Sequence, residues 1–161
     1  LLLGGWTAVM DAGELLQYGP TAEVFHHPAS LRVAKAFSDP PMNLLAAEVA
    51  AGGARLTSGE VIAVELPRES SRGLTLGIRA SALRVQPRPG DVALPGRVEL
   101  AEISGSDTFV HVHTAVGELV AQLTGVHEFD LGAALTLHVS PTQVYAFDAT
   151  GALLVAPQRR T

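Results

Sequence analysis

Short segments of alternating apolar and polar residues fill the chain from Leu44 onward. Gly, Pro, Ser and Asp recur between these segments. Alternation with a period of two places successive side chains on opposite faces of a strand, and many short strands divided by turn residues are typical of a small barrel or sandwich. The predicted strands are residues 44–49, 54–57, 61–66, 74–79, 96–103, 108–114, 118–123, 135–139 and 144–147.

One of these strands changes phase along its length. In the stretch RVELAEI, Val98 and Leu100 share a face, whereas Ile103 falls on the opposite one. An extra residue in a strand shifts the phase in this way and bends the strand. We therefore expect a bulge near Ala101, which lets one strand serve two faces of a barrel.

A different pattern precedes the strands. The stretch TAVMDAGELLQY (7–18) predicts two short strands that turn at DAG, where Gly13 supplies the positive φ of a tight turn. Residues 21–27 and 30–37 have the polar first residues and the apolar spacing of two short helices. The apolar stripe of the second helix predicts packing against a core.

The stretch AFSDPPMNLL separates the two patterns. Its two consecutive prolines each fix their own φ and push the preceding residue out of the helical region, so a helix cannot continue through this point. We expect a hinge that divides a tail of residues 1–39 from a barrel of residues 40–161. The predicted hinge comprises Pro40, Pro41, Met42 and Asn43.

The composition excludes several classes of protein. The 161 residues are 47% hydrophobic and 17% charged, which is too apolar for a disordered tail. The net charge of -5 argues against a nucleic-acid or anionic-membrane partner, because clustered Lys and Arg hold both. No apolar run is long enough to span a bilayer, and the opening LLLGGW lacks the length and basic flank of a signal peptide. The chain starts at Leu1 without a methionine, as a piece of a longer protein does.

Motifs for catalysis are missing from the sequence. Its one lysine, Lys35, follows an alanine, whereas a phosphate-binding loop needs its lysine directly after a glycine. The sequence has no cysteine for a thiol nucleophile and no G-x-S-x-G elbow for a serine nucleophile. We therefore expect this chain to be no enzyme and to hold no cofactor by itself.

Two histidines form a candidate metal site. In FVHVHT the alternation puts the two valines on one face and His111 and His113 on the other. Two imidazoles at this spacing can chelate a transition metal if a third ligand folds nearby. The candidates for that third ligand are His127, Asp107 and Glu118. A solvent-facing strand is the favoured interpretation, so no metal site is predicted. The alternative is a metal site, and its candidate ligands are His111 and His113.

A second candidate binding feature is the stretch SGSD. Successive backbone N–H groups in such a loop can bind an oxyanion. A turn between two strands is the favoured interpretation, and a ligand loop is the alternative. The residues concerned are Ser104, Gly105, Ser106 and Asp107.

The stretch VMDAGELLQYGPTAEVFHHPASLRVAKAFSDPPMN carries a spaced set of motifs. A V-M-x-x-G-x-[IL]-x-Q-x-G strand pair leads to the helical segment PTAEVF, a second helical segment VAKAF, and then P-P-M-N. These motifs resemble the end of the nucleotide-binding domain of bacterial ABC-importer ATPases of the sugar and glycerol-phosphate, maltose-transporter-like class. The matching positions are Val9, Met10, Gly13, Gln17, Gly19, Ala22 to Phe25, Val33, Ala34, Phe37 and Pro40 to Asn43.

The remainder is similar to the regulatory TOBE domain of the same family. LTLGIRASALRV keeps Gly77, Ile78 and Arg79 of the family's G-[IVF]-R-P-E motif, and we expect Ile78 in the core. Ala80 and Ser81 replace the family's proline and glutamate, and residues 1–6 match poorly. The resemblance implies a mainly β fold, in which an OB-like TOBE barrel follows a short α+β tail of an ATPase domain.

The resemblance implies the regulatory and dimerisation region of the ATP-binding subunit of an ABC importer. Two such barrels pair across a two-fold axis, so a second copy is the expected partner. Further partners are membrane permease subunits, reached through the ATPase half, and a cytoplasmic regulator. ATP and Mg²⁺ belong to the full-length parent, because the Walker A, Walker B and signature motifs lie outside this chain. The expected location is the cytoplasmic face of the cell membrane, and the transported solute is left open.

The residues also bear on two other functions, an oxyanion sensor and a nucleic-acid-binding barrel. OB-like barrels of related transporters can bind oxyanions such as molybdate between protomers, and an oxyanion or small-ligand sensor is the alternative function. The motif for that ligand is not visible here, which leaves the SGSD loop as its substitute. A nucleic-acid-binding barrel needs stacking aromatics and a basic groove, but only 5% of the residues are aromatic and the net charge is negative. We therefore expect no nucleic-acid partner.

Overall fold

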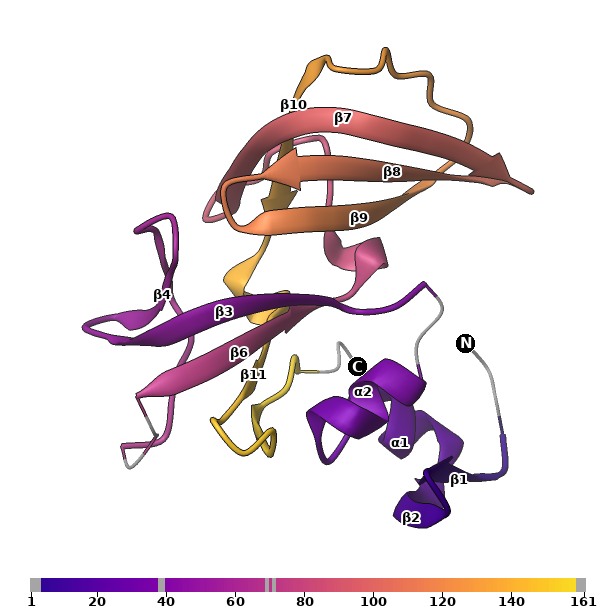
Figure 1. The fold of residues 1–161 in the computed structure, drawn as a ribbon, viewed down its shortest axis with the longest axis vertical. Helices are drawn as coiled ribbons and strands as arrows, with labels where there is room; N and C mark the ends of the chain where they lie inside the picture. The colour runs from indigo at the N-terminus through magenta and orange to yellow at the C-terminus, as the bar shows by residue number, and fades with distance from the viewer. Residues whose placement is uncertain (1–3, 38–39, 69, 71, 159–161) are drawn as a thin grey trace.

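The computed structural model describes residues 4–37, 40–68, 70 and 72–158. Two antiparallel sheets lie one above the other, and a small helical unit lies below them (Figure 1). The upper sheet has four strands, β7 (Val92–Ser104), β8 (Asp107–Thr114), β9 (Gly117–Thr124) and β10 (Ala134–Val139), in the order β10-β7-β8-β9.

The lower sheet has six strands in the order β12-β11-β6-β3-β4-β5. Short 3-10 turns at Ala80–Ala82 and Pro141–Gln143 lead the chain out of this sheet and back into it. The strands are β3 (Asn43–Ala50), β4 (Gly53–Leu56), β5 (Val61–Ile62), β6 (Gly73–Ile78), β11 (Tyr145–Phe147) and β12 (Leu153–Val155).

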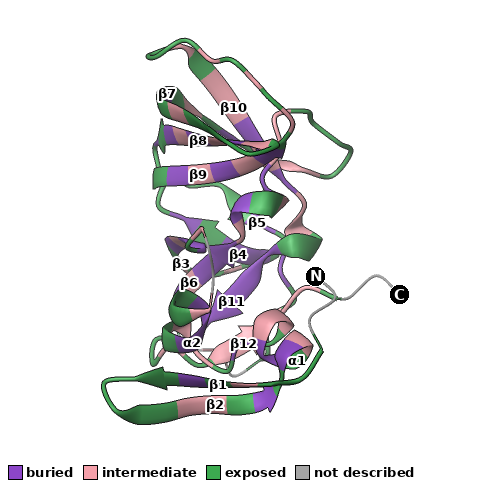
Figure 2. Ribbon diagram, turned by 90° about the vertical axis from the view of Figure 1, so that its right-hand side faces the viewer, coloured by how far each residue is buried: buried purple, intermediate pink, exposed green. Residues whose placement is uncertain are grey.

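One hydrophobic core is shared by the two sheets. Leu45 and Leu76 contribute to it from the lower sheet, and Val110 and Leu119 contribute from the upper one. Along β8 and β9, buried residues accordingly alternate with half-buried or exposed ones (Figure 2). The mainly β class predicted from the alternation is confirmed, and so is the OB-like fold that the resemblance implies. A period-two pattern lines one face of a strand with apolar side chains.

Three details of the strands differ from the prediction. The bulge of β7 lies between Val98 and Leu100 rather than near Ala101, so Leu100 turns outward. The segment predicted as a strand at residues 61–66 pairs only over Val61–Ile62, because the amide of Val64 bonds back to the carbonyl of Ile62 and takes the chain out of the ladder. The short strand β12 was not predicted.

The unit below the sheets contains a hairpin and two short helices. Strands β1 (Trp6–Asp11) and β2 (Glu14–Pro20) turn at Gly13, whose φ is 78°, as predicted. Helices α1 (Thr21–His26) and α2 (Leu31–Ala36) follow, and the Ser30 side chain caps α2. The contact between the hairpin and the helices is buried and apolar, and it consists of Val9, Val24 and Val33.

A charged contact also holds α2 to the hairpin. Arg32 donates to Asp11 at 3.0 Å and to Glu14 at 3.1 Å, and these two hydrogen bonds raise the pKa of the guanidinium. Among the described residues, no helix has the length and apolar character needed to cross a membrane.

Candidate functional site at the junction of tail and barrel

Asn43 connects the two sheets of the barrel. Its side-chain nitrogen donates to the carbonyl oxygens of Ile78 at 3.1 Å and Val120 at 2.9 Å, and its side-chain oxygen accepts from the amide of Val120 at 2.8 Å. Only 7% of Asn43 is exposed, so its side-chain amide needs partners within the protein. The two donated bonds use both of its N–H groups, and the accepted bond uses one of the two lone pairs of its oxygen. The last residue of the P-P-M-N motif is therefore a structural link between β3 and β9.

Met42 packs against Gly77, and together they connect the tail to the lower sheet. Met42 is buried with Ala34 of α2 and with Tyr145 and Phe147 of β11. A Cβ atom built on Gly77 would overlap the Met42 sulfur and lie 3.2 Å from the Phe147 ring. Glycine lets the methionine and the rings approach the backbone this closely, and a larger residue here requires the Met42 side chain to move.

Arg79 extends from the end of β6 to helix α1. Its guanidinium lies 3.8 Å from the centroid of the Phe25 ring, and Nη2 donates to the Phe25 carbonyl oxygen. The Nε atom lies 3.3 Å from the Tyr145 hydroxyl oxygen. Phe25 is near the C-terminus of a helix, where carbonyl groups lack helical partners and a cation is favourable. Arg79 thus forms a clasp between barrel and tail.

A cleft of about 450 Å³ opens beside this clasp. Phe25 and His26 line it from the tail, and Arg79 and Tyr145 line it from the barrel. Ser81, which replaces the family's glutamate, also lines the cleft. The departure from the family motif therefore falls where tail and barrel meet.

The four residues predicted as a hinge have different surroundings. Pro40 and Pro41 lie between α2 and β3, whereas Met42 is buried and Asn43 begins β3. The hinge stays a prediction. Because Met42 and Asn43 are held by their contacts, only the two prolines remain as candidates for it.

Ile78, which we expected in the core, is fully buried.

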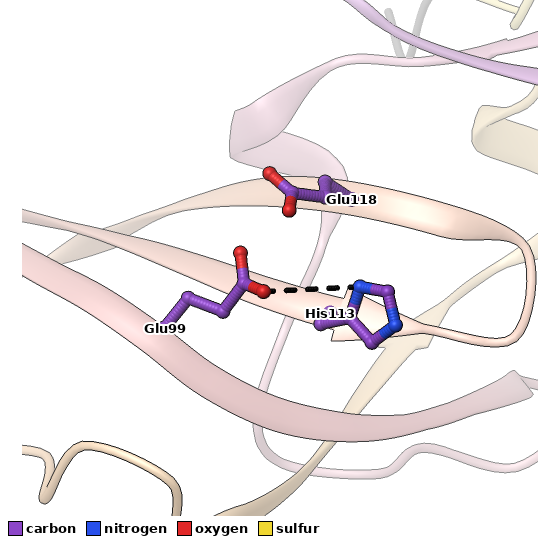
Figure 3. Close-up of side chains that lie close together, drawn as sticks. All are labelled: Glu99, His113 and Glu118. Carbon is purple, nitrogen blue, oxygen red and sulfur yellow. Dashed lines mark ion pairs between the residues drawn. The ribbon is translucent and has the colours of Figure 1, made fainter.

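The candidate metal ligands lie on the outer face of the upper sheet. His113 is exposed, and its Nδ1 atom lies 3.8 Å from a carboxylate oxygen of Glu99 (Figure 3). Glu118 stands opposite His113 on β9 and completes a group of three ligand-type side chains. His111 is opposite Leu100 and Val120 and is not a member of this group.

Other residues suggested as binding groups have partners of their own. Asp107 accepts from Gln122 at 2.8 Å, and His127 contacts the carbonyl oxygen of Thr124 at 2.8 Å, so neither joins His113. The SGSD stretch forms the turn between β7 and β8, with Gly105 at a φ of 62°, as the favoured interpretation predicted. A ligand role for this turn stays a prediction.

Three contributors to these sites were missed from the sequence. Phe25 and Tyr145 complete the Arg79 clasp, and Glu99 completes the group around His113. Glu99 was missed because its position depends on the register between β7 and β8. The signal available in the sequence was that Glu99 is a polar residue on the strand that precedes the strand of His113.

Comparison with known proteins agrees with the fold and with the sequence motifs. Residues 76–147 match the model of the TOBE domain. The sn-glycerol-3-phosphate import ATP-binding protein UgpC of Pectobacterium atrosepticum is 30% identical over 149 residues, which cover 90% of this chain and 42% of that protein. UgpC of Chromobacterium violaceum is 32% identical over 145 residues, covering 88% of this chain and 39% of that protein. The chain thus spans about two fifths of the length of these relatives.

A solved structure shares the barrel. The cytoplasmic molybdate-binding protein ModG, determined with molybdate bound, superposes with a TM-score of 0.53 at 15% identity. The match covers 65% of this chain and 94% of the ModG chain. At this level of identity the likeness concerns the fold alone.

Proposed function

Because this chain carries a TOBE domain and is homologous to importer ATP-binding proteins, we propose that it is the regulatory C-terminal region of the ATP-binding subunit of an ABC importer. In this region, the junction of tail and barrel holds the barrel in a fixed orientation relative to the end of the ATPase domain. The barrels of two copies associate and keep their ATPase domains together as these open and close. The transported solute is sn-glycerol-3-phosphate or a related small molecule, in line with the names of the relatives.

The clasp of Arg79 on Phe25 carries this proposal. It joins a residue of the TOBE motif to a helix that resembles the end of an ATPase domain, and it adds two kinds of contact at one place. A cation over an aromatic ring and a charge-assisted hydrogen bond together resist separation of barrel and tail. When the tail moves, the barrel therefore moves with it as one rigid unit.

The β1–β2 hairpin supports the same arrangement. Its outward face carries Trp6, Met10, Leu15 and Tyr18, each more than half exposed. Its inward face carries Val9, which is buried against the helices, and Gln17, which bonds to the backbone of His27 and Ala29. A hairpin with one solvated face has polar side chains on that face, whereas four large apolar side chains lie on it here. We propose that the body of the parent's ATPase domain covers the apolar face and connects the chain to permease subunits at the cytoplasmic side of the membrane.

No ATPase chemistry is assigned to this chain in the proposal. ATP and Mg²⁺ bind in the parent's ATPase domain, and the chain acts through association and orientation. A cytoplasmic regulator is a further proposed partner of the barrel. Burial of apolar surface between two barrels supplies association energy of about 25 cal/mol per Å², before the cost of ordering.

The solution mass of the chain tests the pairing. Light scattering over a concentration series, with and without molybdate and sulfate, is expected to show a dimer at micromolar concentration that does not depend on the anion. A monomer at every concentration would contradict pairing through the barrel. A mass or melting temperature that changes with the anion would favour the alternative, an oxyanion sensor.

A further inference from the structure

Three side chains that commonly bind metals converge away from the junction. Glu99 of β7, His113 of β8 and Glu118 of β9 each offer one ligand atom, and these atoms all lie within 4.8 Å of one another (Figure 3). All three residues are exposed on the outer face of the upper sheet. An ion can therefore reach the group from solvent without any opening of the fold.

The strand register explains why these residues meet. His113 and Glu118 are direct cross-strand partners in β8 and β9. Glu99 is the extra residue of the β7 bulge, between Val98, which pairs with Val112, and Leu100, which pairs with His111. A bulge redirects the side chain that it inserts. The three ligands thus come from three adjacent, hydrogen-bonded strands, which is a rigid base for a site.

The group carries excess negative charge. Glu99 and Glu118 are both acidic, and His113 is the one imidazole in the group. Arg97 stands opposite His113 in the register, but its guanidinium donates to the carbonyl oxygen of Gly132 at 3.1 Å. Two neighbouring carboxylates with one imidazole therefore have room for a further positive charge.

We propose that Glu99, His113 and Glu118 bind a divalent first-row transition metal ion such as Zn²⁺. Imidazole nitrogen selects ions of this kind over Ca²⁺ and Mg²⁺, which prefer oxygen alone. Ligand atoms bonded to one tetrahedral ion at about 2.1 Å lie about 3.4 Å apart, so rotation of the three exposed side chains closes the group around it. Three protein ligands leave one position of a tetrahedral ion for water.

This site is separate from the proposed regulatory function. It lies on β7, β8 and β9, whereas the clasp lies on β6 and α1. Loss of metal binding therefore leaves the tail and barrel joined, and each proposal can fail without the other.

Titration calorimetry of the chain with Zn²⁺ in a non-chelating buffer tests the site. We expect one ion per chain at micromolar concentration. His113→Ala and Glu118→Gln are expected to weaken this binding by at least tenfold, since loss of even an outer-shell partner weakens metal sites by about 10–100-fold. Co²⁺ absorption provides a second readout of coordination by nitrogen and oxygen.

Two matched variants control for adventitious binding. His111→Ala removes an imidazole from the same face of β8, and Glu102→Gln removes a carboxylate from β7, yet neither residue belongs to the group. Both are expected to bind Zn²⁺ as the unaltered chain does. The proposal is overturned if the unaltered chain shows no saturable binding, or if the cluster variants and the control variants bind equally well. Circular dichroism of each variant checks that the fold is retained.

Discussion

Asn43 and Val120 lie 77 residues apart in the sequence and are joined by two hydrogen bonds, one in each direction. The side chain of Asn43 thereby takes the place of a neighbouring strand for the backbone of Val120. This link ties the first strand after the two prolines to the opposite sheet. It makes the end of the P-P-M-N motif part of the barrel rather than of a flexible joint.

Asn43→Ala is expected to destabilise the barrel strongly. The substitution leaves the backbone groups of Val120 and the carbonyl of Ile78 without this partner, and each buried group left unpaired costs about 1–3 kcal/mol. Asn43→Asp keeps an acceptor for the Val120 amide but places a buried carboxylate oxygen against the carbonyl oxygens of Ile78 and Val120, so a loss at least as large is expected at neutral pH. Urea unfolding measures both, and a change for Asn43→Ala within about 0.5 kcal/mol would contradict the role of this link.

Gly77→Ala is expected to cost about 1–3 kcal/mol of stability, because the added methyl group overlaps Met42 and crowds Phe147. The loss caused by Gly77→Ala should be smaller in a chain that already carries Met42→Ala, since the main overlapping group is then absent. Gly73→Ala is the matched control on the same strand, because among the described residues beyond its chain neighbours no atom lies within 4 Å of the position of its Cβ. Equal losses for Gly77→Ala and Gly73→Ala in thermal unfolding would argue against the close approach.

Arg79→Ala is expected to loosen the tail while the barrel stays folded. The clasp combines a ring contact and charge-assisted hydrogen bonds, together worth about 1–3 kcal/mol. Arg79→Lys should restore little, because an ammonium cannot stack and donate in the same fork geometry. Hydrogen exchange should show faster labelling of α1 but unchanged labelling of β8. The exposed Arg55 of β4 provides the control variant Arg55→Ala, and uniform loss of protection with Arg79→Ala would contradict a local role.

The pair Arg84–Asp91 is expected to make stability depend on pH. The two side chains meet at 2.7 Å, and the hydrogen bond from Arg84 lowers the pKa of Asp91 from its ordinary value of 3.8. A carboxyl with a lowered pKa contributes stability above its unfolded value, and this contribution is lost as pH falls through the folded value. Urea unfolding from about pH 7 down to about pH 3 should therefore show a shallower acid loss for Asp91→Asn. The exposed carboxyl variant Glu65→Gln should keep the slope of the unaltered chain.

The hinge prediction is tested by replacing both prolines. Pro40→Gly with Pro41→Gly increases the freedom of the unfolded chain, which costs about 0.4–1 kcal/mol at each site. The barrel should still unfold cooperatively, and proteolysis between α2 and β3 should become faster. The matched variant, Pro87→Gly with Pro89→Gly in an exposed loop, should leave cleavage at that joint unchanged. Loss of the folded barrel in the first variant would mean that the prolines are needed for the fold itself.

Parts of the sites were within reach of sequence reasoning, and parts were not. Alternation placed His113 outward and Val110 and Val112 inward, and the structure agrees. Family motifs pointed to Asn43, Gly77 and Arg79, but not to what each contacts. Their partners are Val120, Met42 and Phe25, which come from other elements.

Local patterns are enough to predict the strand-rich class, the faces of the strands, the break at Pro40 and the resemblance to importer ATP-binding subunits. A period of two and the fixed φ of proline act within a few residues, so they can be read from the chain alone. The folded chain was needed to find the β7 bulge, the short pairing of β5, the Arg79–Phe25 clasp and the meeting of Glu99 with His113. Each of these depends on the register between strands or on packing between distant elements, which long-range contacts set and no local pattern encodes.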